Sequence, residues 1–343
     1  MNKYVNIEDI EYGDVFSIAD VYEIPASVTI EVNTFCNLYC KHCYIPGHSC
    51  AQLSFETIEN ILHELRELGT FEIVLTGGEI FCRNDALHII KLARNLGFDV
   101  IIFSNATMID ESIARQLSEL YIGLFSTSIY SMSEDIHDGI TGCMGSLKKT
   151  IHGLSLLKKH GIPVEVKTMV MRDNYNEINE IHSFCMENGY GYVASPYIFC
   201  QTDNNKKPLD LRVTSSHLKK VIPVINKIVD FQPCEKKDED YMCSSIQHSF
   251  GIDASGNVYP CNAMFYKVGN INQESIQNIW YSDNLRKIRK LKNKDLYDCR
   301  GCDKAEFCIR CAGIALGENG DMLSKFSYAC EVANVRYQKR NEN

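Results

Sequence analysis

Three cysteines stand close together near the start of the chain, in the stretch "CNLYCKHCY": Cys36, Cys40 and Cys43. Cysteines clustered in this way are metal ligands, and two kinds of centre fit the spacing. A closed zinc site needs a fourth ligand, which His42 or His48 could supply. An iron–sulfur cube on three thiolates instead keeps one iron open for a substrate or cofactor. We favour the cube, because a closed zinc site leaves the chain's other motifs without a role.

The composition is that of a folded globular chain with room for two or three domains: 343 residues, 45% hydrophobic and 23% charged. A formal net charge of -9 does not favour nucleic acid or anionic lipid as partners. The start lacks the apolar core of a signal peptide, and no later run reaches the ~18 apolar residues that span a membrane. These features predict a cytoplasmic protein without a membrane or nucleic-acid partner. In a reducing compartment its sixteen cysteines are not expected to form a disulfide framework, so the clustered ones are predicted to bind metal. Five stand apart from any cluster and are expected to be small buried hydrophobic residues: Cys50, Cys82, Cys143, Cys185 and Cys200.

Strand-like and helical segments alternate over about the first 200 residues. Segments such as "FETIENILHELRELG" carry apolar residues at helical spacing and end in glycine, which favours helix C-termini. The apolar strand-like runs between the helices are 27–32, 71–76, 99–104, 121–129, 163–170 and 190–199. The alternation predicts six parallel strands with outer helices, in a doubly wound sheet or a partial barrel.

Polar motifs follow successive predicted strands. "TGGE" (76–79) follows the second strand, "SNAT" (104–107) follows the third, and the fourth closes with Ser126, Ser128 and Tyr130. Because both candidate folds place chemistry at the carboxyl ends of their strands, we expect these motifs and the three-cysteine loop to open on one face.

Cys36-x3-Cys40-x2-Cys43 resembles the signature loop of radical S-adenosylmethionine enzymes. The resemblance implies a partial (β/α)6 TIM-like barrel, and a [4Fe–4S] cluster on these cysteines whose open iron binds S-adenosylmethionine. One electron then cleaves the cofactor, and the resulting 5′-deoxyadenosyl radical abstracts a hydrogen atom from the substrate.

The same resemblance assigns the cofactor-binding residues. His42 is expected near the adenine. The family's glycine-glycine-glutamate motif, which contacts the methionine amino group, is matched by Gly77, Gly78 and Glu79, with the glycines permitting close backbone approach. Ile80 stands where the family usually has proline. Contacts to ribose and carboxylate groups are expected from Ser104, Asn105, Ser128 and Lys167.

A second group of cysteines occupies the C-terminal third. Its pattern is Cys243-x12-Gly256-x4-Cys261, then Cys299-x2-Cys302-x5-Cys308-x2-Cys311, and finally Cys330. Taken alone, the paired C-x2-C spacing also fits two zinc sites. The whole pattern is similar to the SPASM extension of peptide-modifying radical enzymes, which carries auxiliary iron–sulfur clusters. The usual pattern has three residues before the fourth cysteine of the run, and here there are two, which shifts Cys311 by one position.

The SPASM resemblance implies two sets of ligands. One cluster would be held by Cys299, Cys302, Cys308 and Cys330. The other would be held by Cys243, Cys261 and Cys311, with Cys234 as the candidate eighth cysteine. If Cys234 does not reach this site, one iron stays open and a substrate thiolate could bind there.

The predicted domains are an N-terminal segment (1–26), the partial barrel (27–200), a bridge (201–242) with a helix to about 230, and the SPASM domain (243–343). The first 26 residues are too few for a folded peptide-recognition domain. A leader peptide is therefore expected to dock on the barrel, on the auxiliary domain or through a separate partner protein.

The resemblance predicts a radical enzyme that modifies a peptide or protein and receives electrons from a flavodoxin- or ferredoxin-type donor. Maturation of a ribosomally made peptide, by a thioether or other cross-link, oxidation or epimerisation, is the leading function. A sulfatase-type maturase that forms formylglycine shares both cysteine patterns. A non-catalytic zinc- or cluster-binding scaffold predicts no turnover and no need for Glu79. The sequence assigns no catalytic acid, base or hydrogen donor.

Overall fold

The computed structural model describes residues 12–47 and 51–341, and it contains one nine-stranded sheet of order β6-β5-β4-β3-β2-β1-β7-β8-β9. Strands β1 to β6 are parallel and follow one another in chain order, which confirms the predicted (β/α)6 partial barrel. They are β1 (Ser27–Glu31), β2 (Glu72–Thr76), β3 (Asp99–Phe103), β4 (Leu124–Ser128), β5 (Val164–Met169) and β6 (Gly191–Ser195). The last strand is shorter than predicted, because Pro196 has no N–H to continue the ladder.

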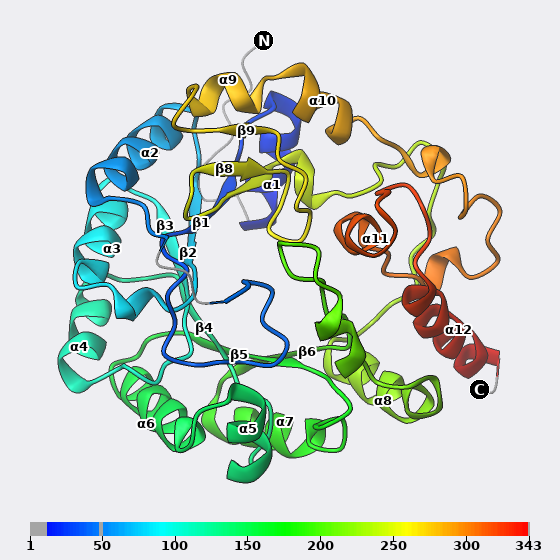
Figure 1. Cartoon of the computed structure of the whole chain (residues 1–343), viewed down its shortest axis with the longest axis horizontal. Helices are drawn as coiled ribbons and strands as arrows, with labels where there is room; N and C mark the ends of the chain where they lie inside the picture. The colour runs from blue at the N-terminus through cyan, green and yellow to red at the C-terminus, as the bar shows by residue number, and fades with distance from the viewer. Residues whose placement is uncertain (1–11, 48–50, 342–343) are drawn as a thin grey trace.

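Helices cover the outer side of the arc of strands, and the loop after β1 lies inside it (Figure 1). They are α2 (Phe55–Glu67), α3 (Ala86–Asn95), α4 (Glu111–Glu119), α5 (Glu134–Thr141), α6 (Ser146–Lys159) and α7 (Ile178–Asn188). Helix α2 illustrates their construction. Ser54 caps its start by accepting a hydrogen bond from the Thr57 N–H, and the helix buries one apolar face. Gly69 follows its end with a φ of 85°, as the terminal glycine predicted.

The cysteine-rich region continues the sheet of the barrel. Strand β7 (Ser249–Ile252) pairs in parallel with β1, and β8 (Asn257–Tyr259) and β9 (Gly269–Asn270) follow antiparallel. Helices α9 (Ile276–Trp280), α10 (Asp283–Arg289), α11 (Ala312–Asn319) and α12 (Ser327–Asn341) complete the region. The pairing of β7 with β1 joins it directly to the barrel edge, and the domain limits at 27, 201 and 243 stay predictions.

Two further helices flank this core. Helix α1 (Tyr12–Tyr22) precedes β1, and α8 (Ser215–Ile228) lies in the bridge, where a helix to about 230 was predicted. Short 3₁₀ turns are η2 (Ile80–Cys82), η3 (Lys207–Leu211), η4 (Ser245–Gln247), η5 (Asn293–Asp295) and η6 (Ala305–Phe307). Among the helices of the described ranges, none has the length and apolar character needed to cross a membrane.

Candidate cofactor and active site

A cavity of about 420 Å³ lies at the carboxyl ends of the barrel strands. It brings together ten of the predicted cofactor-site residues: Cys36, Cys40, His42, Cys43, Gly77, Gly78, Ser104, Asn105, Ser128 and Lys167. Glu79 is the one predicted member that does not line it. The motifs therefore meet on one face, because every strand that carries them runs in the same direction.

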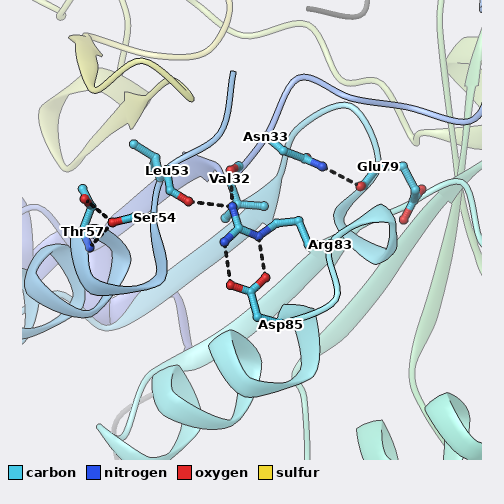
Figure 2. A network of polar contacts seen from close by, with 8 residues as sticks. All are labelled: Val32, Asn33, Leu53, Ser54, Thr57, Glu79, Arg83 and Asp85. Atoms are coloured by element: carbon cyan, nitrogen blue, oxygen red, sulfur yellow. Dashed lines mark hydrogen bonds and ion pairs between the residues drawn. The ribbon is translucent and has the colours of Figure 1, made fainter. Parts of the chain in front are cut away.

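Arg83 fastens the loop that carries the three cysteines. Its Nη1 donates to the carbonyl oxygens of Val32 and Leu53, at 2.8 and 2.7 Å, so it joins the two ends of the loop (Figure 2). The carboxylate of Asp85 accepts from Nε and Nη2 and holds the guanidinium in place. The Arg83 side chain is only 2% exposed. No sequence motif marks Arg83, because the carbonyl groups that it binds are 51 and 30 residues away in the chain.

The three thiols of the loop are partly buried. Burial raises the pKa of Cys36 and of Cys40 to about 12, and it also raises the pKa of Cys43. Within the described residues, no three Cys, His, Asp or Glu side chains are already gathered as a closed metal site. A bound cluster would supply the positive charge that makes such thiols thiolates. The donor set thus fits an iron–sulfur cluster, with Asn105 Nδ2 3.8 Å from the sulfur of Cys36.

His42 offers an unpaired polar atom at the cavity. Its Nδ1 is buried without a hydrogen-bond partner among the described residues, and burial lowers its pKa to about 4. The ring packs edge-on against Tyr130, with centroids 4.9 Å apart. A neutral imidazole with a free nitrogen fits a ligand that forms hydrogen bonds, such as adenine. His48, the other histidine weighed as a zinc ligand, lies outside the described residues.

Gly77 and Gly78 must be glycines because they pack directly against the backbone of the cysteine loop. A Cβ at Gly77, whose φ is 151°, would lie 2.3 Å from the carbonyl oxygen of Asn33, and one at Gly78 would lie 2.2 Å from that of Phe35. Side chains at these positions would therefore push the cysteine loop away. We expected the glycines to let the backbone come close to the cofactor. In the structure, they let it come close to the cysteine loop.

The Glu79 carboxylate joins two loops. Oε1 accepts from the Phe81 N–H at 3.0 Å and the Ser104 hydroxyl at 2.8 Å, while Oε2 accepts from the Asn105 N–H at 2.8 Å. Only 1% of Glu79 is exposed, and burial raises its pKa despite these three bonds. The loops after β2 and β3 are thereby tied together. A direct contact of Glu79 with the cofactor stays a prediction.

The remaining cofactor-site residues already have partners within the chain. Asn105 Nδ2 donates to Asn37 Oδ1 at 2.8 Å, so this side chain holds the cysteine loop. Lys167 Nζ lies 3.2 Å from a carboxylate oxygen of Glu165 and 3.9 Å from the centre of the Phe103 ring. Contacts from these residues to S-adenosylmethionine stay predictions, as does the contact from Ser128.

The C-terminal thiols were predicted to form two sets of cluster ligands, and the structure gives the surroundings of each set. The first set lines a cavity of about 580 Å³ together with Lys236, Arg300, Lys304 and Arg310: Cys299, Cys302, Cys308 and Cys330. In the second set, the pKa of Cys261 is raised to about 12, mainly by burial and in part by the charges of Cys311 and Cys243. The four cations of the first cavity fit an anionic cluster with thiolate ligands. That these cysteines ligate clusters stays a prediction.

Cys234 lies apart from the second set. Its side chain is exposed and donates to the carbonyl oxygen of Glu235, and its N–H donates to that of Glu306. Glu306 is two residues before Cys308, which belongs to the first set. Within the described chain, no contact of Cys234 with the second set is seen.

The parallel partial barrel and the cavity with three thiols define a radical enzyme of the S-adenosylmethionine-cleaving class. A model of the radical SAM superfamily matches residues 30–185, and a model of the SPASM iron–sulfur cluster-binding domain matches residues 243–303. The chain belongs to the radical SAM superfamily and carries a C-terminal SPASM domain. It is thus an enzyme whose cofactors are S-adenosylmethionine and iron–sulfur clusters, and when bound these supply a radical that can take a hydrogen atom from carbon.

Three known proteins illustrate the relationship. An AdoMet-dependent heme synthase of Oleidesulfovibrio alaskensis is 24% identical, over 86% of this chain and 84% of that protein. The subtilosin biosynthesis protein AlbA of Bacillus subtilis is 25% identical, over 86% of this chain and 68% of AlbA. Streptococcus suis SuiB bound to S-adenosylmethionine has the same fold, with a TM-score of 0.70 at 17% identity, covering 96% of this chain and 84% of SuiB. The chain is therefore related to enzymes that mature peptides, and also to heme synthases.

Proposed function

We propose that this enzyme oxidises a peptide substrate, as a maturase of a ribosomally made peptide. The observation that carries the proposal is the contact between the cysteine loop and the SPASM region. Tyr44, next to Cys43, stacks on Phe265, with ring centroids 5.9 Å apart and planes at 13°. Phe265 follows Cys261 by four residues. A substrate held here lies between the source of the radical and a second iron–sulfur site that can take up an electron.

The chain's own residues divide the work in this proposal. Cys36, Cys40 and Cys43 bind the cluster, and Glu79 holds the loops around it. His42, in the loop after β1, and Lys167, in β5, bind S-adenosylmethionine in the cavity that both line. The two C-terminal sets of cysteines hold auxiliary clusters. The protein thus supplies orientation and electron acceptors, while the radical chemistry belongs to the cofactor.

A thioether is the product that the position of Cys234 favours. With Cys234 at the surface, the set of Cys243, Cys261 and Cys311 offers three thiols, one fewer than a cluster with four cysteine ligands needs. A cysteine of the substrate peptide would complete this site and present its sulfur for bond formation. The relationship to AlbA, a bacteriocin biosynthesis protein, supports a peptide substrate.

Oxidation of a tetrapyrrole is the second candidate function. It is supported by the relative named as a heme synthase, which is matched over 84% of its own length, compared with 68% of AlbA. The two candidates differ in the substrate and not in the way the radical is formed.

The test is turnover by the anaerobically reconstituted enzyme with S-adenosylmethionine, a reduced flavodoxin or dithionite, and the short peptides encoded beside its gene. A peptide that loses two hydrogens contains a cross-link or an oxidised residue, and fragmentation shows whether a cysteine sulfur is joined to carbon. Formylglycine would identify a sulfatase-type maturase, and unchanged mass with one solvent deuterium would indicate epimerisation. Turnover of a tetrapyrrole with no change in any peptide would contradict the peptide proposal.

A further inference from the structure

A second cavity, of about 220 Å³, adjoins the cofactor cavity. Thr34 and Ile45 line both cavities, so the two cavities are direct neighbours. One side of the second cavity is the segment after Cys43, and the other is the β7–β8 hairpin with Asn262, the residue after Cys261. This cavity therefore lies between the cluster loop and the segment that carries Cys261, and no sequence motif points to it.

Glu31, the last residue of β1, presents a carboxyl group to this cavity. Only 7% of the residue is exposed. Oε1 accepts a hydrogen bond from the Tyr44 hydroxyl at 2.5 Å, while Oε2 has no hydrogen bond to any residue that the structure describes. Nor does a described Lys, Arg or His form an ion pair with it. One oxygen is thus anchored and the other is available to a molecule in the cavity.

The ionisation of Glu31 suits proton transfer near neutral pH. Burial raises its pKa to about 7; the hydrogen bond from Tyr44 lowers it, and the negative charge of Asp253 raises it. Two other titratable groups lie near this carboxyl: Tyr259 of the hairpin, whose hydroxyl is bonded to Asp253, and the Cys43 thiol of the cluster loop, whose pKa the charge of Glu31 raises. A carboxyl group whose pKa is near the operating pH is an effective general base.

Asp253, the other acid of the cavity, is already committed to the hairpin turn. Its carboxylate accepts from the N–H groups of Ser255 and Asn257, from the Asn257 side chain and from the Tyr259 hydroxyl. Both of its carboxylate oxygens are thus already bonded to donors of the hairpin. Glu31 is therefore the carboxyl in this cavity that has a free oxygen.

Oxidative coupling of a peptide releases a proton. Removal of one hydrogen atom from carbon leaves a carbon radical. When that carbon joins a second atom that carried hydrogen, such as a thiol sulfur, the X–H bond breaks and the C–X bond forms. One electron and one proton then leave, so the product has lost two hydrogens in all. The electron needs a one-electron acceptor, and an iron–sulfur cluster of the SPASM domain would be one. The proton needs a base.

We propose that Glu31 is the base that accepts this proton, through Oε2, from a substrate held in the second cavity. The inference rests on the proposed peptide oxidation and adds the acid–base residue that the sequence did not assign. The electron and the proton then leave the same cavity by two routes, one toward the second set of cysteines and one to Glu31.

The test compares the full-length, reconstituted wild type with Glu31→Gln and Glu72→Gln. Glutamine keeps an acceptor for the Tyr44 hydroxyl but cannot take up a proton, so it separates basicity from positioning. Glu72 is the matched control, because it is also 7% exposed and accepts a hydroxyl hydrogen bond at 2.5 Å, from Ser27 at the opposite end of the barrel. The probe is the peptide whose mass changes in the turnover experiment, deuterated at the carbon that is attacked.

Glu31→Gln should still transfer deuterium into 5′-deoxyadenosine at a rate within about twofold of wild type, while product formation falls by about 10²-fold or more. Wild-type product formation should rise with pH through about 7, because the carboxylate form exists above the pKa of the folded protein, and this rise should be absent in the variant. Glu72→Gln should match wild type. Product from Glu31→Gln within twofold of wild type would overturn the proposal.

A measurement without substrate separates this inference from the proposed function. Infrared difference spectra of wild type minus Glu31→Gln should show a protonated carboxyl group that disappears as the pH rises through about 7. A flat spectrum from pH 5 to 8 would overturn the role of Glu31 even if the peptide is modified. Absence of any peptide product from the wild type would instead contradict the proposed function, and the role of Glu31 would fall with it.

Discussion

Replacement of Glu79 by glutamine tests whether this residue stabilises the fold through its hydrogen bonds or only binds the cofactor. The glutamine carbonyl oxygen can keep the two hydrogen bonds of Oε1, from Phe81 and Ser104. Its NH₂ group then faces the Asn105 N–H, which now donates to Oε2 at 2.8 Å. Two donors would oppose each other in a site that is 1% exposed, so the Asn105 N–H would be left without an acceptor.

The expected cost follows from that single lost acceptor. A buried donor without a partner costs ~1–3 kcal/mol, so the folding equilibrium should weaken by about 5- to 150-fold. Asn105 also contacts the cysteine loop, through Asn37 and the sulfur of Cys36, and its displacement should loosen that loop. We therefore expect S-adenosylmethionine to bind about tenfold more weakly or worse, in addition to the loss of stability.

The assays are denaturant unfolding followed by circular dichroism, iron content, and an anaerobic titration with S-adenosylmethionine. Glu72→Gln serves again as the buried control. Weaker cofactor binding with an unchanged free energy of unfolding would mean that Glu79 acts only on the cofactor, as the family resemblance implies. If neither quantity changed, the reasoning from these three hydrogen bonds would be refuted.

Three further predictions concern the cluster sites. Replacing Cys36, Cys40 and Cys43 together by alanine should abolish 5′-deoxyadenosine formation with dithionite yet leave iron and sulfide in the C-terminal region; continued cleavage, or loss of all iron, would contradict separate sites. Cys234→Ala in that background should leave the electron paramagnetic resonance spectrum unchanged, because this thiol is exposed, whereas added cysteine peptide should perturb it; a spectrum changed by the substitution would make Cys234 a ligand. Gly78→Ala should lower the free energy of unfolding by ~1–3 kcal/mol or more, because its Cβ would lie 2.2 Å from a carbonyl oxygen of the cysteine loop. A thermal unfolding midpoint equal to that of wild type would contradict this contact.

Sequence patterns that act over short distances were sufficient for the barrel. The alternation of apolar runs located all six parallel strands, because strand and helix periodicity is a local property. The end of β6 at Ser195 was missed, although Pro196 was visible, because apolar residues continue beyond it. Spacing also located the three-cysteine loop, whose ligands are neighbours in the chain.

The family resemblance grouped the C-terminal cysteines into two sets, which their spacing alone did not do. The C-x2-C pairs also fitted zinc, and the split of the C-terminal thiols into two sets came from the SPASM pattern. In the structure the first set lines one cavity, and Cys261 lies within the electrostatic reach of Cys243 and Cys311. The position of Cys234 could not be decided in this way, because it depends on how the bridge folds back.

Only the tertiary structure decided which distant groups meet, because burial and hydrogen bonding between them have no local signature. Arg83 holds carbonyl groups 51 and 30 residues away, and β7 extends the sheet from β1 across more than two hundred residues. A contact of Glu79 with the cofactor stays a prediction, and the structure adds that its carboxylate binds the loop after β3. Glu31 had no motif at all. Its burial beside Tyr44 and Asp253, with one oxygen free toward a cavity, arises only when the barrel and the cysteine-rich region pack together, and that packing made an ordinary strand-end glutamate a candidate base.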